Sequence, residues 1–156
     1  MTADLPSEVV EGLAEWIALD PDVQTTARTV AAWLPAIEPA RPHMPAVYVH
    51  EQGCADSRES FTGPTGGVRQ EQWRLLIDVW WPITTQDPAA AQAGAADLAA
   101  VVMRRVRSEP TWGGLVVHSG GAIVMALPDD PYAALLAGRG ILLRHLTVTA
   151  ALYPPS

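Results

Sequence analysis

The segment from Gln70 to Trp81, with the sequence QEQWRLLIDVWW, constrains the fold more than any other. Its apolar residues occupy alternate positions, namely Trp73, Leu75, Ile77, Val79 and Trp81, and polar residues such as Asp78 fall between them. A period of two is typical of a strand with one buried face, because successive side chains of a strand point to opposite sides. Leu76 and Trp80 break the alternation, which predicts that part of the second face is covered too. We predict a strand over Val68–Trp81, ended by Pro82.

An alanine-rich run follows this strand and predicts a helix that ends near Arg107. Asp87 is a favourable N-cap, and Pro88 takes the first helical position, where its missing N–H costs nothing. The apolar stripe of this helix consists of Ala91, Ala95, Leu98, Val102 and Val106. An earlier helix begins at Pro6 and should end before Asp20-Pro21, because a residue that precedes proline avoids the helical region. Its stripe consists of Leu5, Val9, Leu13, Trp16 and Ile17.

The remaining chain predicts short strands joined by turns. Strands are expected at residues 46–52, 115–118, 122–127 and 141–152, with 115–118 and 122–127 forming a hairpin around Ser119-Gly120-Gly121. Turns are expected at 129–131 and 138–140, and a flexible glycine-rich loop at 53–67. Residues 23–37 fit either a helix or a strand. This order predicts one α+β domain over residues 1–156, with an antiparallel or mixed sheet and two or three helices packed on one face.

Composition excludes several classes of function. The net charge of −7 argues against a nucleic-acid-binding face, which needs clustered cations. The single cysteine, Cys54, excludes an internal disulfide and a multi-cysteine zinc site. No apolar run is long enough for a membrane helix, and the N-terminus does not resemble a secretory signal, so we expect a soluble chain that is intracellular at synthesis. Charged residues make up only 17% of the chain, against about 25% in typical domains, which favours surface hidden against partners.

Residues that could carry chemistry form no recognisable motif. His43, His50, His118 and His145 are scattered, although folding could bring His118 and His145 together on neighbouring strands. Asp129 and Asp130 precede a proline and are read as turn formers rather than as an acid pair. The segment Ser119-Gly120-Gly121 lacks the context of a nucleophile elbow. We therefore expect no catalytic residue, no cofactor and no metal.

The features that remain point to contacts between proteins. Arg104, Arg105 and Arg107 form the only dense positive cluster, which either caps its helix or contacts an acidic partner such as a second copy. Residues 1–22 supply that acidity, with six carboxylates and no cation. Tryptophans at 80, 81 and 112 are either core residues or interface residues. The candidate interface residues are Trp80, Trp81, Arg104, Arg105, Arg107, Trp112, Asp129 and Asp130.

The order of these elements resembles the tail terminator (tail completion) proteins of long-tailed bacteriophages. The resemblance comprises an N-terminal amphipathic helix, PAVYVHEQG, a glycine-rich loop, EQWRLLIDVWW, the helix DPAAAQAGAADLAAVVMRRV, a short hairpin and the closing strand RGILLRHLTVTAALY. It implies a virion protein that is not an enzyme. Copies of this protein would assemble into a homo-oligomeric ring, expected to be a hexamer, and the ring would stop growth of the tail tube.

The partners that the resemblance implies are the tail tube protein and the head–tail connector, with DNA only as passing cargo. The implied location is the virion tail or neck, and the host cytoplasm during assembly. The alternatives are another neck or head completion connector subunit, or a small α+β enzyme or ligand-binding domain whose site forms only in three dimensions.

Overall fold

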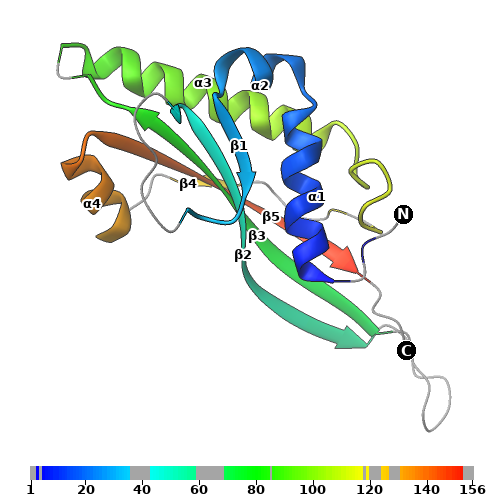
Figure 1. Cartoon of the computed structure of the whole chain (residues 1–156). Coiled ribbons are helices and arrows are strands. Elements are labelled where there is room, and N and C mark those ends of the chain that lie inside the picture. The colour runs from blue at the N-terminus through cyan, green and yellow to red at the C-terminus, as the bar shows by residue number, and fades with distance from the viewer. Residues whose placement is uncertain are drawn as a thin grey trace, which may run out of the picture.

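The computed structural model describes residues 3, 5–35, 43–58, 69–84, 86–117, 119, 124–126 and 131–152, and the structural statements below concern these residues. Its helices are α1 (Pro6–Ala18), α2 (Pro21–Thr26), α3 (Pro88–Arg107) and α4 (Pro131–Gly138). Its strands are β1 (Thr29–Ala32), β2 (Ala46–Arg58), β3 (Arg69–Pro82), β4 (Val124–Ala126) and β5 (Ile141–Leu152). The predicted α+β fold with a mixed sheet is confirmed (Figure 1).

The strand β3 lies at the centre of the sheet, whose order in the described chain is β1-β2-β3-β5-β4. It pairs antiparallel with β2 on one side and with β5 on the other, while β1 pairs parallel with β2. Asp78, in the middle of β3, is in register with Tyr48 of β2 and His145 of β5. The sequence segment with the clearest period of two is therefore the strand with two long neighbours.

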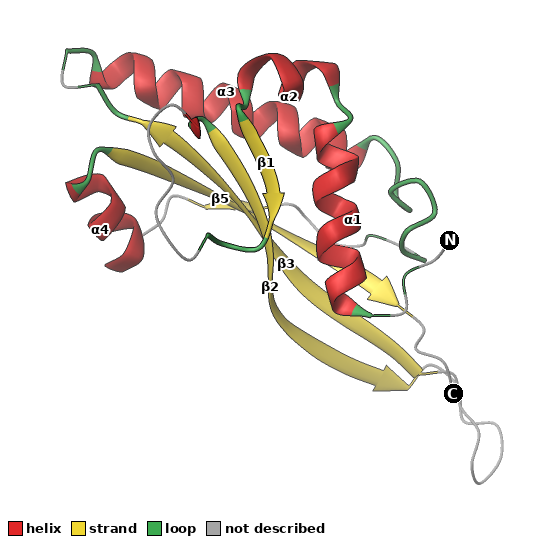
Figure 2. Ribbon diagram, in the orientation of Figure 1, coloured by secondary structure: helices red, strands yellow, loops and turns green. Residues whose placement is uncertain are grey.

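The helices α1, α2 and α3 cover one face of the sheet, which we call the helix face (Figure 2). Leu75, Ile77 and Val79 are fully buried there against apolar residues of α1 and α3. Trp73 and Trp81 are partly buried against the same cluster. The five apolar residues at odd-numbered positions of β3 thus point to the helices, as the alternation predicts.

The second face of the sheet is covered at one end by α4, on the side opposite to α1, α2 and α3 (Figure 2). Leu136 of α4 packs in a smaller core cluster with Ile141, Leu143 and Trp80. The Trp80 ring meets Tyr48 edge-on, with ring centroids 5.1 Å apart. Trp80, which breaks the alternation, therefore belongs to a second core. The prediction that part of the second face is covered is confirmed.

The segment 23–37, which fitted helix or strand, contains parts of both. Asp20 ends the chain's first helical stretch and caps α2, because its Oδ1 accepts hydrogen bonds from the backbone N–H groups of Asp22 and Val23 at 2.9 and 3.1 Å. The chain then becomes extended, and Val30 of β1 pairs with Val47 of β2. The mixed periodicity of the segment reflects this change within fifteen residues.

The predicted hairpin around residue 120 is wrong. Residues 111–117 form turns and bends. Of the described residues in the predicted hairpin, Val124–Ala126 form a strand, which pairs with β5. Gly113 and Gly114 have φ of 71° and 86°, a left-handed conformation that glycine adopts without strain. Val116 is buried all the same. The apolar run at 115–117 is thus buried by a turn, which a short run cannot distinguish from a strand.

Two further predictions need correction. Residues 53–58, expected in a flexible loop, extend β2, because its pairing with β3 resumes after an irregularity between Glu51 and Gly53 and continues to Arg58. No helix was predicted between the turns expected at 129–131 and 138–140, but α4 begins at Pro131 and ends at Gly138. Residues 129 and 130 lie outside the described residues. The α4 sequence PYAALLAG has strong helix formers but no polar face, so it lacks the amphipathic stripe by which the other helices are found.

The contact between α3 and β3 is close enough to require a glycine. A Cβ added to Gly94 would overlap the six-membered ring of Trp81, whereas a Cβ on Gly138 of α4 would meet no atom within 4 Å. We predict that Gly94→Ala lowers the free energy of unfolding by about 1–2 kcal/mol, because overpacking outweighs the gain in helix propensity. Gly138→Ala is the matched control and should change stability by less than about 0.5 kcal/mol. Urea denaturation of both variants measures the difference, and equal stabilities would contradict the close packing.

Candidate functional site

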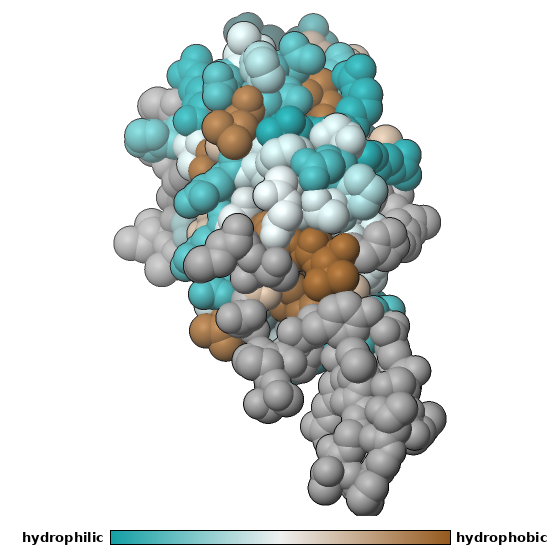
Figure 3. Space-filling view, turned by 90° about the vertical axis from the view of Figure 1, so that its right-hand side faces the viewer, coloured by the Kyte–Doolittle hydropathy of each residue, from teal (hydrophilic) through white to brown (hydrophobic). Residues whose placement is uncertain are grey.

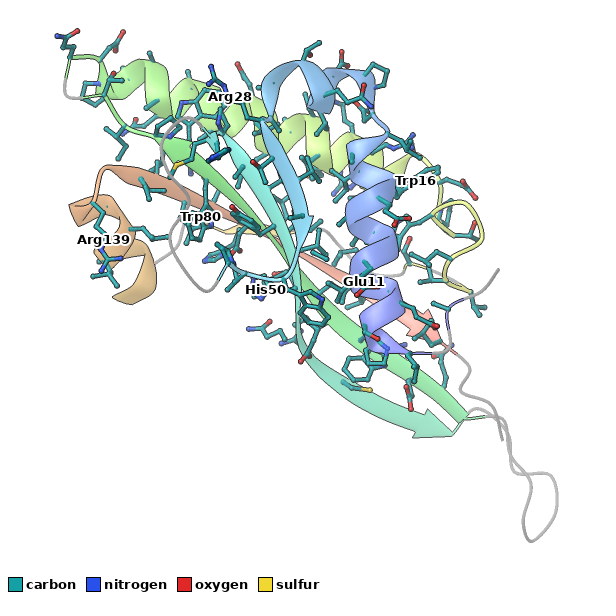
Figure 4. The ribbon with its side chains drawn as sticks, in the orientation of Figure 1. Glu11, Trp16, Arg28, His50, Trp80 and Arg139 are labelled. Carbon is teal, nitrogen blue, oxygen red and sulfur yellow. The ribbon has the colours of Figure 1, made fainter. Side chains whose placement is uncertain are left out.

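The half of the second sheet face that α4 leaves uncovered carries polar side chains, and we call it the open sheet face. It is formed by the parts of β2, β3 and β5 that lie beyond the α4 cluster, on the side away from the helix face. Arg74, Asp78 and Trp80 all point to this side of β3, because they are separated by even numbers of residues. Asp78 lies two residues before Trp80, and Arg74 lies four residues before Asp78. His50 of β2 is labelled beside Trp80 in Figure 4.

Three titratable side chains meet at the centre of the open sheet face. Asp78 is almost completely buried, with 1% of its side chain exposed, and His50 and His145 lie on either side of it. Oδ2 of Asp78 is 3.1 Å from Nε2 of His50, and Oδ1 is 2.5 Å from Nδ1 of His145. Each carboxylate oxygen thus accepts one imidazole N–H, and the two rings are held in a fixed orientation.

These contacts determine the ionisation of Asp78. Burial alone would raise the pKa of its carboxyl group, because the charged form loses solvation. The hydrogen bonds from His145 and His50, with their electrostatic attraction, outweigh burial and hold the pKa below 3.8. The group is therefore a stable carboxylate at neutral pH, and it acts as the common acceptor that positions both histidines.

The array does not have the arrangement of a metal centre. No group of three or more His, Cys, Asp or Glu side chains suited to a metal ion occurs among the described residues. One ring nitrogen of each histidine is used by Asp78, so the carboxylate and the rings satisfy one another rather than converging on a third atom. The expected pairing of His145 with His118 is not testable, since His118 lies outside the described residues. His43 is exposed.

A surface hollow lies further along the open sheet face, where β2 is irregular. It has a volume of about 260 Å³ and is lined by Gln52, Gly53, Cys54, Gln72, Arg74 and Thr149. Arg74 and Gln72 are exposed, and Arg74 makes no hydrogen bond or ion pair with another described residue. This end of the face therefore presents a guanidinium group to the surroundings.

The arginine cluster at the end of α3 is divided between structure and surface. Arg105 lies over the ring of Trp16, with its guanidinium carbon 3.6 Å from the ring centroid. Figure 4 labels Trp16 on α1. Nε of Arg105 donates to the carbonyl oxygen of Trp16 at 2.9 Å, and Trp16 Nε1 donates back to the Arg105 carbonyl oxygen at 3.3 Å. Arg105 thus joins α3 to α1, while Arg104 and Arg107 are exposed.

Some of the charges proposed to meet between two copies line one hollow within a single chain. Asp20 and Asp22, at the start of α2, line the same surface hollow of about 250 Å³ as Arg104 and Arg105. Part of the acidic excess of residues 1–22 therefore faces the arginine cluster of its own chain.

The other candidate interface residues differ in their exposure. Trp80 and Trp112 are buried at 2% exposure, and Trp112 Nε1 donates to the Val106 carbonyl oxygen at 3.0 Å. Trp81 is half-buried against α3. The structure thus places Trp80 and Trp112 in the core, which is one of the two readings open for them from sequence. Asp129 and Asp130 lie outside the described residues.

A third hollow lies between α1 and the edge strand β1, and we call it the acidic groove. It has a volume of about 270 Å³, with Glu11 and Glu15 from α1 and small apolar residues of both elements, including Ala14, Ala18, Val30 and Ala32. Both glutamates are exposed, and neither makes a hydrogen bond or an ion pair with another described residue. Figure 4 labels Glu11 on α1. Sequence analysis noted the acidity but not that a groove accompanies it.

Apolar side chains are exposed on the same side of the molecule. Figure 3 shows an apolar patch among polar atoms on the side that carries α1 and the turn at residues 111–117. Leu5, which precedes α1, is 57% exposed, and Val117 is 41% exposed. Leu19, Trp33 and Leu34 are also exposed, next to the ends of α1 and β1. Exposed apolar groups that lie close together are a feature of protein contact surfaces.

Comparison with models of protein families and with curated proteins identifies no relative. The chain matches no model of a protein family, and no curated protein matches it at a significant level. In the described part of the chain, no helix combines the length and the apolar character that crossing a membrane requires.

The buried carboxylate predicts a pH-dependent contribution to stability. Asp78→Ala should lower the free energy of unfolding at pH 7 by roughly 3–5 kcal/mol, the range for removing one partner of a buried charged network. Because the folded pKa of Asp78 lies below 3.8, its contribution is complete above that value and is lost as the pH falls through the folded pKa. Denaturation at several pH values should show the gap between wild type and variant narrowing in that acidic range. Asp97→Ala, at an exposed position, is the control. An equal loss of unfolding free energy in the two variants would refute a special role for Asp78.

The contact between Arg105 and Trp16 predicts different effects for neighbouring arginines. Arg105→Ala should destabilise the fold by about 1–2 kcal/mol, since it removes the stacking contact and one hydrogen bond. Arg107→Ala, on the same helix but exposed, should change stability by less than about 0.5 kcal/mol. Thermal unfolding of the two variants side by side measures this, and the reverse order would show that Arg105 does not join the two helices.

Proposed function

We propose that this chain is a subunit of a homo-oligomeric ring, expected to be a hexamer, that acts as the tail terminator of a long-tailed bacteriophage. In this role it stops growth of the tail tube and forms the surface that joins the tube to the head–tail connector. The proposal starts from the resemblance in the order of elements. It is supported by an α+β fold in which the long strands of that order form one sheet with α1 and α3 packed on it, although β4 and α4 stand where the short hairpin was expected.

The observation that carries the proposal is the length of β2 and β3 relative to the helices that cover them. The two strands have 13 and 14 residues, and they run past the end of α1 (Figure 1). A strand pair that continues beyond the helix layer contributes contact surface more than core. Ring subunits need such surface, because each one must contact two neighbours as well as the tube and the connector.

The charge of the chain suits a ring around DNA. Its net charge of −7 would repel the phosphate backbone, so DNA passing through the lumen would not be retained. The chain has only 17% charged residues, and large apolar side chains such as Leu5 and Leu19 are exposed. Surfaces of this kind are suited to burial between subunits.

Two alternatives remain. Another neck or head completion connector subunit would share the same physical properties and differ in its partner. A small enzyme or ligand-binding domain is favoured by one observation, the pair of histidines oriented by Asp78 next to a polar hollow. Carboxylate-oriented histidines occur in catalytic sites as well as in structural networks.

The oligomeric state tests the proposal. We predict that light scattering after size-exclusion chromatography shows, alone or as concentration is raised, a species of about six times the mass of one chain, which electron microscopy images as a ring. Added to polymerising tail tube protein, the chain should cap the tubes and shorten their mean length. A connector subunit would form rings that leave tube length unchanged. A strict monomer without effect on tubes would overturn the proposal in favour of the enzyme or ligand-binding alternative.

A further inference from the structure

We propose that neighbouring subunits of the ring meet by placing the Arg74 end of the open sheet face of one copy against the acidic groove of the next. This inference rests on the proposed function, because it names the subunit contact of the proposed ring. The partner is a second copy of this chain, and the charges on the two surfaces identify it.

No cation is among the described residues that line the acidic groove. Residues 1–27 contain no lysine or arginine. Glu11 and Glu15 lie four residues apart on α1, where two like charges repel each other. Neither carboxylate has a hydrogen-bond or ion-pair partner among the described residues, and both line the hollow against β1. A cation brought by a partner would relieve this repulsion.

The floor of the groove favours arginine over other cations. Ala14 and Ala18 of α1 and Val30 and Ala32 of β1 give it small apolar side chains. An arginine can lay its three methylene groups on such a floor while its guanidinium group reaches the carboxylates. A space of about 270 Å³ is sufficient for such a side chain.

Arg74 is the cation that can enter the acidic groove of another copy. It is exposed on β3, it lines the hollow of the open sheet face, and no carboxylate is among the residues that line that hollow. Asp78, the acid nearest to it on the same face of the strand, is buried and bonded to two histidines. The arginines of α3 are less suitable, because Arg105 is held by Trp16 and shares a hollow with Asp20 and Asp22.

The two surfaces lie on opposite sides of one sheet. The acidic groove is on the helix face, next to α1, while Arg74 points away from it with Asp78 and Trp80. A chain therefore does not satisfy its own groove with its own Arg74. A contact between two different surfaces of identical subunits is heterologous, and repetition of such a contact closes a ring or builds a filament rather than a two-fold dimer.

The experiment uses charge reversal with complementation. Variant A carries Glu11→Arg and Glu15→Arg, and variant B carries Arg74→Glu. All three positions are exposed. Each variant alone should self-associate about 100-fold more weakly than wild type, because like charges then meet across every contact. An equimolar mixture should recover assembly in a ring where A and B alternate. At one contact the positively charged groove of A meets the negatively charged position 74 of B, and at the next contact the native groove of B meets the native Arg74 of A.

Matched controls are Asp97→Arg and Arg107→Glu, which reverse exposed charges on α3 and should assemble like wild type. Mass by light scattering at several concentrations is the readout, with circular dichroism to verify folding. The contact is overturned if A and B assemble like wild type, if their mixture recovers no assembly, or if Arg107→Glu alone prevents assembly. A wild-type chain that stays monomeric overturns the ring and the contact together, whereas rings that form regardless of Arg74 overturn the contact alone.

Discussion

The buried carboxylate of Asp78 is the interaction on which the arrangement of the sheet depends. It lies in the central strand, and its two oxygens accept hydrogen bonds from a histidine on each neighbouring strand. A one-residue slip of β3 would turn Asp78 toward the apolar helix face and bring Leu75 and Ile77 out of it. The cost of burying an unpaired carboxylate makes that slip much less favourable than the native register. One polar contact thus fixes the register of three strands.

Sequence alone predicts the elements with strong periodicity and fails where the determinants are not local. The alternation of β3 and the capped, striped helix α3 are recovered within one or two residues. The meeting of His50, Asp78 and His145 was missed, because it depends on the pairing of three strands separated by 28 and 67 positions. A polar residue in the middle of an apolar strand was its only local signal. The helix α4 was not predicted because it has no polar face. The hairpin was predicted wrongly because the apolar run of a buried turn looks like that of a strand.

The two faces of the sheet are unequal, and this inequality gives the molecule its contact surfaces. Three helices cover one face, whereas α4 covers only one end of the other, where Trp80 and Leu136 form a second core. The rest of that face is polar and is stabilised by the Asp78 array instead of by a helix. A sheet face with exposed Arg74 and Gln72 beside half-buried histidines needs no further cover to be stable. It is therefore available to a partner without exposing the core.

The distribution of charge explains how an acidic chain can bind its own copies. Acids at the start of α2 line the same hollow as the arginines of α3 within one chain. Glu11 and Glu15 lie on one side of the sheet and Arg74 lies on the other. Complementary charges on opposite sides of one molecule orient copies head to tail, and they add specificity more than affinity. The affinity would come from exposed apolar groups near the groove, such as Leu19 and Trp33, so the polar and apolar parts of the surface have separate roles in assembly.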